Sequence, residues 1–564
     1  MRNNVKLPYG ISNFERLVTQ NYKIIDKTGF IEQLENLGEP YIFFLRPRRF
    51  GKSLFISTLM YYYDINHRDK FDKLFKDLYI GKNPTPLKNS YNILFFEFSR
   101  IDTRNIEVTY NAFLERIKSS IEVYCKNYDI DKKITEGILL NKSPEMVMTT
   151  FFKYTKEFNH KIYIMIDEYD HFANKMMVDN LSLFQKMVQD NGFMRLFYET
   201  IKTATFDNVV DRLFVTGVTP ITLDSMTSGF NIGSNLTAFH ALNEMHGFTK
   251  EEVFQLINVE IEDKEKVVDF MQKLYNGYLF STESDIRVYN SDMVLYFLKY
   301  YNAWNKAPRE LIDINIASDY GKIKRMFLLG EREENYYILQ SMLNGNEVYG
   351  NLTPQFSFEK DFDRNDFLSL LFYMGMITID SARGDLIKYT IPNFVIKRLY
   401  WEFFANYLKE RKNVKFNITD IQNAIMALAY DNKTDLILKE LEKVLKMLSN
   451  RDYLKFDEKY IQLLFITLIN HSKLYYIKSE NEVKQRYPDV MLMHRPPYFE
   501  PHQFLFEFKY MKKTDNDSVL RKLIKEGRKQ VGIYRQIDEI RDIKDLKSYL
   551  VIFKKDEMVY KEEL

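Results

Sequence analysis

The fold of the N-terminal half is decided by the stretch Tyr41-Ile-Phe-Phe-Leu-Arg-Pro-Arg-Arg-Phe-Gly-Lys-Ser-Leu-Phe-Ile-Ser-Thr-Leu59. Its apolar start predicts a buried strand, its end predicts a helix, and a turn containing Pro and Gly lies between them. Gly51-Lys52-Ser53 falls where the helix begins. Unpaired backbone N–H groups and the positive end of the helix dipole attract phosphate there. The stretch therefore predicts a phosphate-binding loop between a strand and a helix.

This turn supplies the candidate ligands for ATP and Mg²⁺. Lys52 is expected to reach the β- and γ-phosphates, and the Ser53 hydroxyl to bind Mg²⁺. The neighbouring Arg49, Phe50, Gly51 and Leu54 complete the predicted nucleotide contacts. The general pattern G-x-x-x-x-G-K-[ST] has a glycine where this chain has Arg46, which is a departure from it.

A second strand, Lys161–Ile166, ends in acids and completes the predicted ATP site. Asp167 is expected to hold the metal through water, and Glu168 to polarise the attacking water as a general base. Thr216, at the end of a further strand, is a candidate sensor of the γ-phosphate. Two alternatives stay open: the acids are helix caps, and Thr216 is a strand-end turn residue.

Strands alternate with helices between Tyr41 and Thr219, which predicts a mostly parallel sheet in an α/β fold. The predicted strands are Tyr41–Leu45, Asn92–Phe98, Lys161–Ile166 and Arg212–Thr216. Helical stretches follow from about Thr249, and Lys250–Ile257 and Lys264–Leu274 are predicted to be amphipathic helices. A helix near Asp363–Met376, a strand at Ile377–Ile379, a polar turn at Ser381–Gly384 and a strand at Leu386–Thr390 resemble a winged helix. The predicted parts are a P-loop domain (1–248), a helical and winged-helix-like region (249–410), a helical connector (411–452) and a last α/β domain (453–564).

Composition restricts the class of protein. Lys plus Arg total 80 and Asp plus Glu 78, so a net charge of +2 gives no general attraction to nucleic acid or membrane. Cys125 is the only cysteine, which excludes a disulfide framework and a cysteine zinc site. The apolar runs are too short to span a membrane, and the N-terminus has no signal-like segment. A cytoplasmic location without membrane partners is expected.

Several motifs along the chain resemble one family, the AAA-ATPase-like proteins with a C-terminal PD-(D/E)XK nuclease domain. The motifs are Lys-Leu-Pro-Tyr-Gly at 6–10, Ile-Asp-Lys-Thr at 25–28, Arg-Pro-Arg-Arg-Phe-Gly-Lys-Ser at 46–53, Ile-Asp-Glu-Tyr-Asp at 166–170, Phe-Val-Thr-Gly-Val-Thr-Pro at 214–220, Tyr-Asn-Gly-Tyr-Leu-Phe at 275–280 and Val-Tyr-Asn at 288–290. In that family Arg commonly replaces the first P-loop glycine. The resemblance implies a restriction-endonuclease-like α/β domain at the C-terminus.

The C-terminal acids are arranged as a metal-dependent nuclease would need them. Glu507 and Lys509 lie two apart on a predicted strand and therefore face the same side. If Asp489 lies on the adjacent strand, the two carboxylates hold a divalent metal while Lys509 activates water. Glu480 would complete the acidic cluster. From the resemblance, Gln530 on a basic helix faces the site. The alternative is a solvated charged strand, since Glu-x-Lys is common.

Two functions are open on this sequence. In the first, an ATPase gates a nuclease that uses Mg²⁺ or Mn²⁺ to cut DNA. In the second, a signalling or assembly ATPase carries an inactive nuclease-like fold that binds a partner or nucleic acid. The acids and Lys509 favour the first. The spacing from Arg486 to Asp489, one residue longer than the family's usual form, keeps the second open. A homo-oligomeric state also stays open.

Overall fold

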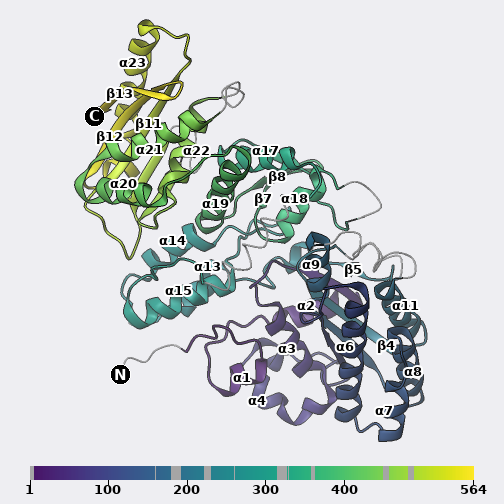
Figure 1. Cartoon of the computed structure of the whole chain (residues 1–564). Helices are drawn as coiled ribbons and strands as arrows, with labels where there is room; N and C mark the ends of the chain where they lie inside the picture. The colour runs from purple at the N-terminus through teal and green to yellow at the C-terminus, as the bar shows by residue number, and fades with distance from the viewer. Residues whose placement is uncertain are drawn as a thin grey trace. The chain divides into compact units, whose positions relative to one another are not determined.

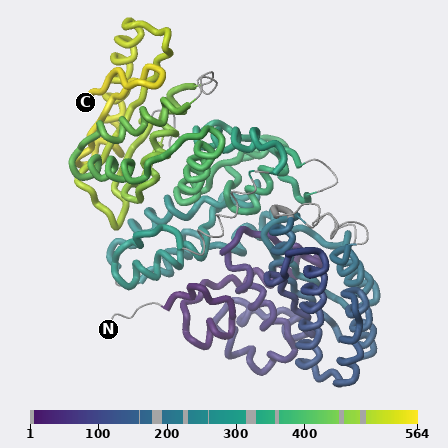
Figure 2. Tube along the Cα trace, in the orientation of Figure 1, coloured from purple at the N-terminus to yellow at the C-terminus, as the bar shows by residue number. Residues whose placement is uncertain are grey.

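A computed structural model of the chain describes residues 6–158, 160–179, 192–221, 230–258, 261–313, 327, 329–356, 362–448, 456–479 and 488–564. The chain forms two compact units (Figures 1 and 2). The first unit comprises Met1–Trp304, Ile312–Asn335 and Tyr349–Asn393, and the second comprises Asn305–Leu311, Tyr336–Val348 and Phe394–Leu564. The second unit is therefore built from three separate stretches of sequence.

The first unit contains a five-stranded parallel sheet in the order β2-β3-β4-β1-β5. Its strands are β1 (Tyr41–Leu45), β2 (Asn92–Glu97), β3 (Ile162–Asp167), β4 (Val210–Gly217) and β5 (Ser234–Asn235). The four strands predicted from sequence are confirmed to within two residues at each end, because their apolar runs fill both faces of the sheet. The two-residue β5 was not predicted.

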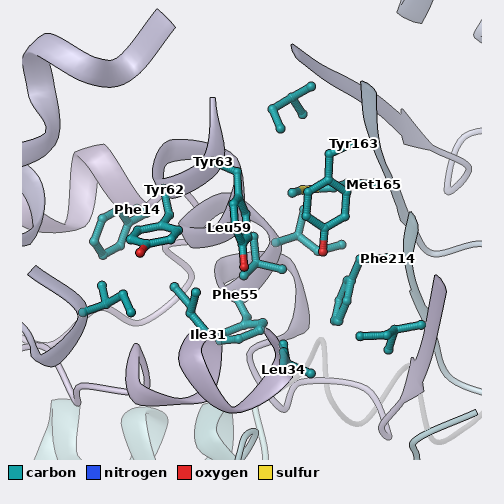
Figure 3. Packing of buried hydrophobic residues seen from close by; sticks show 14 of the residues in the cluster. Phe14, Ile31, Leu34, Phe55, Leu59, Tyr62, Tyr63, Tyr163, Met165 and Phe214 are labelled. Atoms are coloured by element: carbon teal, nitrogen blue, oxygen red, sulfur yellow. The ribbon is translucent and has the colours of Figure 1, made fainter. Parts of the chain in front are cut away.

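Helices cover both faces of this sheet. They are α1 (Phe14–Thr19), α2 (Gly29–Asn36), α3 (Lys52–Tyr63), η1 (Ile65–Lys70), α4 (Phe71–Phe75), α5 (Tyr79–Lys82), α6 (Ile106–Asn127), α7 (Lys132–Leu139), α8 (Pro144–Glu157), α9 (His171–Asp179) and α11 (Phe193–Phe206). Figure 3 shows one face, where α1, α2 and α3 pack on β3 and β4. On the other face the Phe96 ring meets Phe197 of α11 at 5.4 Å between centroids.

The helical region after β5 belongs to the same unit. It contains η2 (His240–Leu242), α13 (Lys250–Leu256), α14 (Lys264–Tyr275) and α15 (Ser291–Trp304). Thr249 caps α13: its hydroxyl accepts from the backbone N–H of Glu252, whose carboxylate accepts from that of Thr249. The amphipathic helices predicted at 250–257 and 264–274 are confirmed as α13 and α14.

The winged-helix-like segment is a helix followed by a β-hairpin. It consists of α18 (Arg364–Tyr373), β7 (Thr378–Arg383) and β8 (Leu386–Thr390), with β6 (Val348–Gly350) as a third strand and α17 (Arg332–Leu343) before it. The turn predicted at Ser381–Gly384 is wrong, because Ser381 still pairs with Lys388. The chain reverses instead at Gly384 and Asp385, where Gly384 adopts a φ of 63° that favours glycine.

This segment packs against the turn between β1 and α3. The second half of α18 is buried on every side, and the Phe372 ring meets Phe280 at 6.1 Å. A Cβ on Gly375 would lie 2.9 Å from the Pro47 side chain, so only glycine fits at this distance. The second half of the helix before the hairpin therefore packs against the nucleotide half, and only its first turn is partly exposed.

The second unit contains a mixed five-stranded sheet in the order β13-β12-β11-β10-β9. Its strands are β9 (Tyr475–Ser479), β10 (Val490–His494), β11 (Gln503–Met511), β12 (Leu546–Lys554) and β13 (Glu557–Glu563). Only β11 and β12 are parallel neighbours. Its helices are α19 (Phe394–Arg411), α20 (Ile418–Asp431), α21 (Thr434–Met447), α22 (Glu458–Ile469), α23 (Asp517–Tyr534) and α24 (Asp538–Arg541).

The aromatic side of β11 packs on α22, and the opposite side packs under α23. The Phe465 ring lies 4.9 Å from Phe506 and 5.1 Å from Phe508. Leu505 and Met511 face α23. The packing of a helix on each face of the sheet fixes the side of β11 on which each charged residue must lie.

Two earlier stretches of sequence complete the second unit. The Arg495 guanidinium, fully buried, donates to the Arg309 carbonyl at 3.1 Å. Lys473 pairs with Glu310, and the Lys459 amine donates to the Asn344 carbonyl at 3.3 Å. The C-terminal part of the chain is thus tied to residues 305–311 and 336–348. In the described part of the chain, no helix is long and apolar enough to cross a membrane.

The turn at Gly277 provides a test of how tightly the first unit is packed. Its φ is 108°, and an added Cβ would lie 2.0 Å from the Pro392 carbonyl oxygen. We expect Gly277→Ala to lower the free energy of unfolding by roughly 3 kcal/mol, because strain and a backbone clash add. Urea denaturation measures the loss.

The matched control is Gly384→Ala, which also has a positive φ but meets nothing within 4 Å. It should cost about 1 kcal/mol, from the backbone strain alone. Equal losses for the two variants would mean that the contact with Pro392 is not a constraint.

Candidate functional sites

The turn from β1 to α3 presents the start of a helix to a cavity. Gly51 is the N-cap of α3 with a φ of 91°, and Arg49 has a φ of 70°. Such left-handed backbone favours glycine, and the two residues together reverse the chain tightly. The first N–H groups of α3 are left without helical partners by this geometry. The turn can therefore receive a phosphate.

Lys52 lies within this turn in a buried position. Its amine donates to the carbonyls of Arg46 and Pro47 at 3.0 and 2.9 Å. Burial lowers the pKa of Lys52 to about 8, while the carboxylates of Asp167, Asp170 and Glu168 act in the opposite direction. An anionic phosphate would supply the countercharge that the two carbonyls supply only in part.

Arg46, which stands where the general motif has glycine, points away from the cavity. It is only 1% exposed, and its guanidinium lies 4.2 Å from the ring centroids of Phe44 and Phe280. It donates to the carbonyls of Thr237 and Leu242 at 2.6 and 3.0 Å. The departure from the motif therefore has a structural cause, since the side chain fastens the turn to the segment after β5.

The acids predicted for the same site lie at the end of β3. Asp167 is buried. Burial raises the pKa of Asp167, while the nearby Ser53 hydroxyl and the Lys52 charge oppose that rise. The two side chains that the sequence assigned to Mg²⁺ therefore lie near each other. A hydroxyl beside a carboxylate is a donor set that fits this ion.

Glu168 follows with a φ of 51° and lines the cavity. Its carboxylate lies 3.3 Å from the Nδ1 atom of His171, and this contact is the main cause of its lowered pKa. A carboxylate that stays ionised can accept a proton from water. The backbone at Glu168 is held in a conformation rare for a non-glycine residue, which is common at functional sites.

Thr216 and Asp170 have partners that the sequence did not reveal. The Thr216 hydroxyl is fully buried and donates to the Phe44 carbonyl at 2.6 Å. Asp170 accepts from the backbone N–H groups of Val218 and Thr219, and from the Thr219 hydroxyl at 2.8 Å. Thr216 therefore joins two strands, and Asp170 fixes the loop that follows β4.

The cavity beside the turn has a volume of about 550 Å³ and lies within the first unit. Its walls come from 48–55, 245–248 and 291–295, from the N-terminal segment around Asp26-Lys27-Thr28, and from Glu168. The Lys27 amine donates to Glu252 at 2.7 Å and to the Glu244 carbonyl at 2.9 Å. Residues 26–28 thus form part of the wall, a role that the sequence did not predict.

Motifs far along the chain hold the turn in place. Asn290 donates from its amide to the Arg48 carbonyl at 3.2 Å. The Phe50 ring meets Tyr278 and Phe280 edge-on at 5.0 and 5.5 Å. The Gly247 N–H donates to the Phe50 carbonyl at 3.3 Å. The turn is therefore preorganised by the helical region and does not depend on its own sequence alone.

The C-terminal acids lie on two neighbouring strands. Val490 of β10 pairs with Phe506 of β11, so Asp489 comes opposite Glu507 on the same side of the sheet. Both acids are buried, and Asp489 accepts from the Phe508 N–H at 2.6 Å. The Lys509 amine donates to Glu507 at 2.7 Å. The structure thus brings together three of the five predicted residues.

The surroundings of Lys509 include an acid that the sequence did not single out. Glu458, at the start of α22, lies 3.3 Å from the Lys509 amine. Burial alone would lower the pKa of Lys509, but the charges of Glu507, Asp489 and Glu458 outweigh it and raise that pKa. The sequence signal that could have identified Glu458 is its position in the first turn of a helix, directly after the N-cap Asp457.

Two further residues were predicted for this site, Glu480 and Gln530. Glu480 lies outside the described residues. Gln530, on α23, is half-buried, and its amide oxygen has no hydrogen-bond partner in the described chain. Across the same ranges no group of three or more His, Cys, Asp or Glu side chains is arranged to hold a metal. Two carboxylates can still hold Mg²⁺ when water supplies the remaining ligands.

Two family models match the chain in the regions that carry these sites. Residues 8–227 match the model described as predicted AAA-ATPase. Residues 456–563 match the PD-(D/E)XK nuclease superfamily. The chain joins an AAA-ATPase-like region to a PD-(D/E)XK nuclease-like region. The AAA-ATPase-like region contains the β1–α3 turn and the end of β3, and the nuclease-like region contains Asp489, Glu507 and Lys509.

One curated protein and two solved structures to which the chain is similar are distant from it in sequence. An uncharacterized protein in the vnfD 5′ region of Azotobacter chroococcum mcd 1 is 24% identical over 93% of this chain and 92% of its own length. A Walker-type ATPase of Pyrococcus abyssi is 13% identical, with a TM-score of 0.37 over 67% of this chain and 96% of that one. The Aeropyrum pernix ORC2 protein is 10% identical, with a TM-score of 0.31 over 71% and 98%.

The Asp170 network predicts a large effect on stability. Asp170→Asn should lower the free energy of unfolding by roughly 3 kcal/mol, because the amide cannot accept from all the buried donors. Thermal and urea denaturation measure it. Asp207→Asn is the control, because Asp207 pairs with Lys156 on the protein surface. This substitution should lower the free energy of unfolding by less than about 1 kcal/mol. A small loss at Asp170 would contradict the network.

Proposed function

We propose that the N-terminal half binds ATP with Mg²⁺ and hydrolyses it. The observation that carries this proposal is the buried Lys52 amine at the start of α3, in a cavity whose wall also contains Gly51, Ser53 and Glu168. A metal-binding pair and a phosphate-binding cation at one helix start are what a nucleoside triphosphate requires. The cavity of about 550 Å³ is large enough for a ligand of that size.

Each residue of this site has a proposed role. Lys52 exchanges its carbonyl partners for the β- and γ-phosphate oxygens, and the backbone of Arg49, Phe50, Gly51 and Leu54 surrounds the phosphates. Ser53 binds Mg²⁺ directly, and Asp167 binds it through water. Thr216 is left out of the nucleotide contacts, because its hydroxyl already donates to Phe44.

Glu168 is the proposed general base. Its lowered pKa keeps the carboxylate ionised at neutral pH, so it can take the proton of the attacking water. His171, at 3.3 Å from this carboxylate, positions it. Mg²⁺, when bound, neutralises the charge that develops on the phosphate oxygens. The chain's own contribution is therefore to orient the phosphates and to accept one proton from the attacking water.

For the C-terminal half we propose a phosphodiesterase that acts on DNA under the control of the ATPase. Asp489 and Glu507 would hold Mg²⁺ or Mn²⁺, with Glu480 as a further ligand, and Lys509 would orient water. Gln530 would face the same site. The register of β10 and β11, which sets both acids on one side of the sheet, supports this role.

A second function is favoured by one observation. Asp489 already accepts from the Phe508 N–H, and Glu507 is paired with Lys509, so both acids have internal partners. If these partners are not displaced by a metal, the fold is an inactive module that binds a partner or nucleic acid, and the ATPase serves signalling or assembly. The four-part division at 248, 410 and 452, the cytoplasmic location and any homo-oligomer remain predictions.

Two variants test the ATP site in the full chain. Lys52→Ala removes the charge facing the phosphates and should weaken ATP binding about a hundredfold, or 2.7 kcal/mol. Glu168→Gln should preserve binding and lower kcat about a hundredfold or more, because an amide accepts no proton. Calorimetry measures the first and phosphate release the second. Wild-type affinity in Lys52→Ala would reject the site.

The nuclease function needs its own assay. Asp489→Ala and Lys509→Ala should each abolish Mg²⁺- or Mn²⁺-dependent cleavage of linear, circular and single-stranded DNA, while ATP hydrolysis continues. Lys513→Ala is the control: Lys513 is exposed and lies outside the acidic cluster. If the wild-type chain cuts none of these substrates with or without ATP, the binding-module function replaces the nuclease.

A further inference from the structure

The cations that line the nucleotide cavity differ in how they are engaged. They are Lys23, Lys27, Arg48, Arg49 and Lys52. Lys27 pairs with Glu252, Arg49 with Asp292 at 3.4 Å, and Lys52 with two carbonyls. In the part of the chain that the structure describes, the guanidinium of Arg48 forms no hydrogen bond or ion pair. Arg48 is thus a half-buried cation in the wall of this cavity whose charge no described residue pairs with.

The position of Arg48 is fixed by its backbone. Its carbonyl accepts from the Asn290 amide at 3.2 Å, and the next residue, Arg49, adopts the left-handed conformation. Pro47 precedes it and packs near Gly375. A residue held on both sides in this way presents its side chain to the cavity without a loop rearrangement.

Arg48 shares this wall with Lys52 and Glu168. Arg48 and Lys52 belong to the same turn, in which the Lys52 amine donates to the carbonyls of Arg46 and Pro47. In the proposed site Lys52 meets the β- and γ-phosphates, and Glu168 meets the water that attacks the γ-phosphorus. A side chain close to both therefore lies next to the γ-phosphate position. Guanidinium suits that place, because its fork matches two phosphate oxygens.

We propose that Arg48 contacts the γ-phosphate of ATP from within the same chain and distinguishes ATP from ADP. The proposal rests on the ATP-binding function proposed above. It assigns to the turn itself a charge that many nucleotide hydrolases obtain from a second polypeptide. In hydrolysis, the bond between the γ-phosphorus and the bridging oxygen breaks as water adds. Glu168 takes the water proton, and Arg48 stabilises the charge on the γ-phosphoryl oxygens.

Equilibrium binding tests this assignment without activity. Calorimetry with Mg²⁺ compares ADP with a non-hydrolysable ATP analogue on the full chain. Arg48→Ala should weaken the analogue about ten- to a hundredfold, the loss expected for a charge-assisted contact, and change ADP affinity less than about threefold. Arg48→Lys should recover part of the loss. Retained ADP binding also reports that the variant is folded.

Lys23→Ala is the matched control, because it removes an exposed charge of the same cavity from the N-terminal segment. Any loss it causes should be equal for ADP and the analogue. An unchanged ADP-to-analogue ratio in Arg48→Ala would overturn the proposal. If Lys52→Ala then still loses both nucleotides, only the role of Arg48 fails. If the wild-type chain binds neither nucleotide, the ATP function itself fails.

Hydrolysis distinguishes a contact in the same chain from one supplied by another copy. The wild-type rate per chain should be independent of protein concentration, and Arg48→Ala should lower kcat more than it raises KM. Arg48→Ala chains mixed with Lys52→Ala chains should stay inactive. Recovery of activity in the mixture would show that Arg48 acts across two copies and would overturn the proposal.

Discussion

The buried guanidinium of Arg46 is the interaction on which the nucleotide half depends. It lies between the rings of Phe44 and Phe280 and donates to carbonyls of Thr237 and Leu242. A charge this deep would be costly without those acceptors. Arg46 thereby holds together the end of β1, the segment after β5 and Phe280 of the helical region. The shape of the phosphate-binding turn is therefore a property of the whole first unit.

The two candidate sites differ in the partners of their buried lysine. Around α3, the buried Lys52 amine has neutral carbonyls as its hydrogen-bond partners, so an anionic phosphate can replace them. In the C-terminal sheet, Lys509 already neutralises Glu507, so a metal must compete with an internal cation. Phosphate can therefore bind at the first site in its present arrangement. At the second site, Lys509 must move away from Glu507 before a metal can bind.

The sequence was sufficient to predict those elements whose pattern lies in residues close together along the chain. The strand–turn–helix at Tyr41–Leu59 and the strand bearing Glu507 and Lys509 follow from apolar periodicity, and both family regions were identified from motifs. It was not sufficient where a partner lies far away. Nothing near Arg46 indicates carbonyls beyond residue 236, and Glu458 is indistinguishable from an ordinary acid in a first helical turn. The catalytic roles themselves remain predictions, since geometry places the residues without testing their chemistry.

The discontinuity of the second unit bears on how such a chain could have arisen. The polypeptide passes between the two units at 304/305, 311/312, 335/336, 348/349 and 393/394. An end-to-end gene fusion would leave a single junction. Here the buried Arg495 needs the carbonyl of Arg309, and Lys459 needs that of Asn344. Recombination between relatives therefore has to exchange three segments together, and the ATPase-like and nuclease-like halves are expected to have evolved as one inherited block.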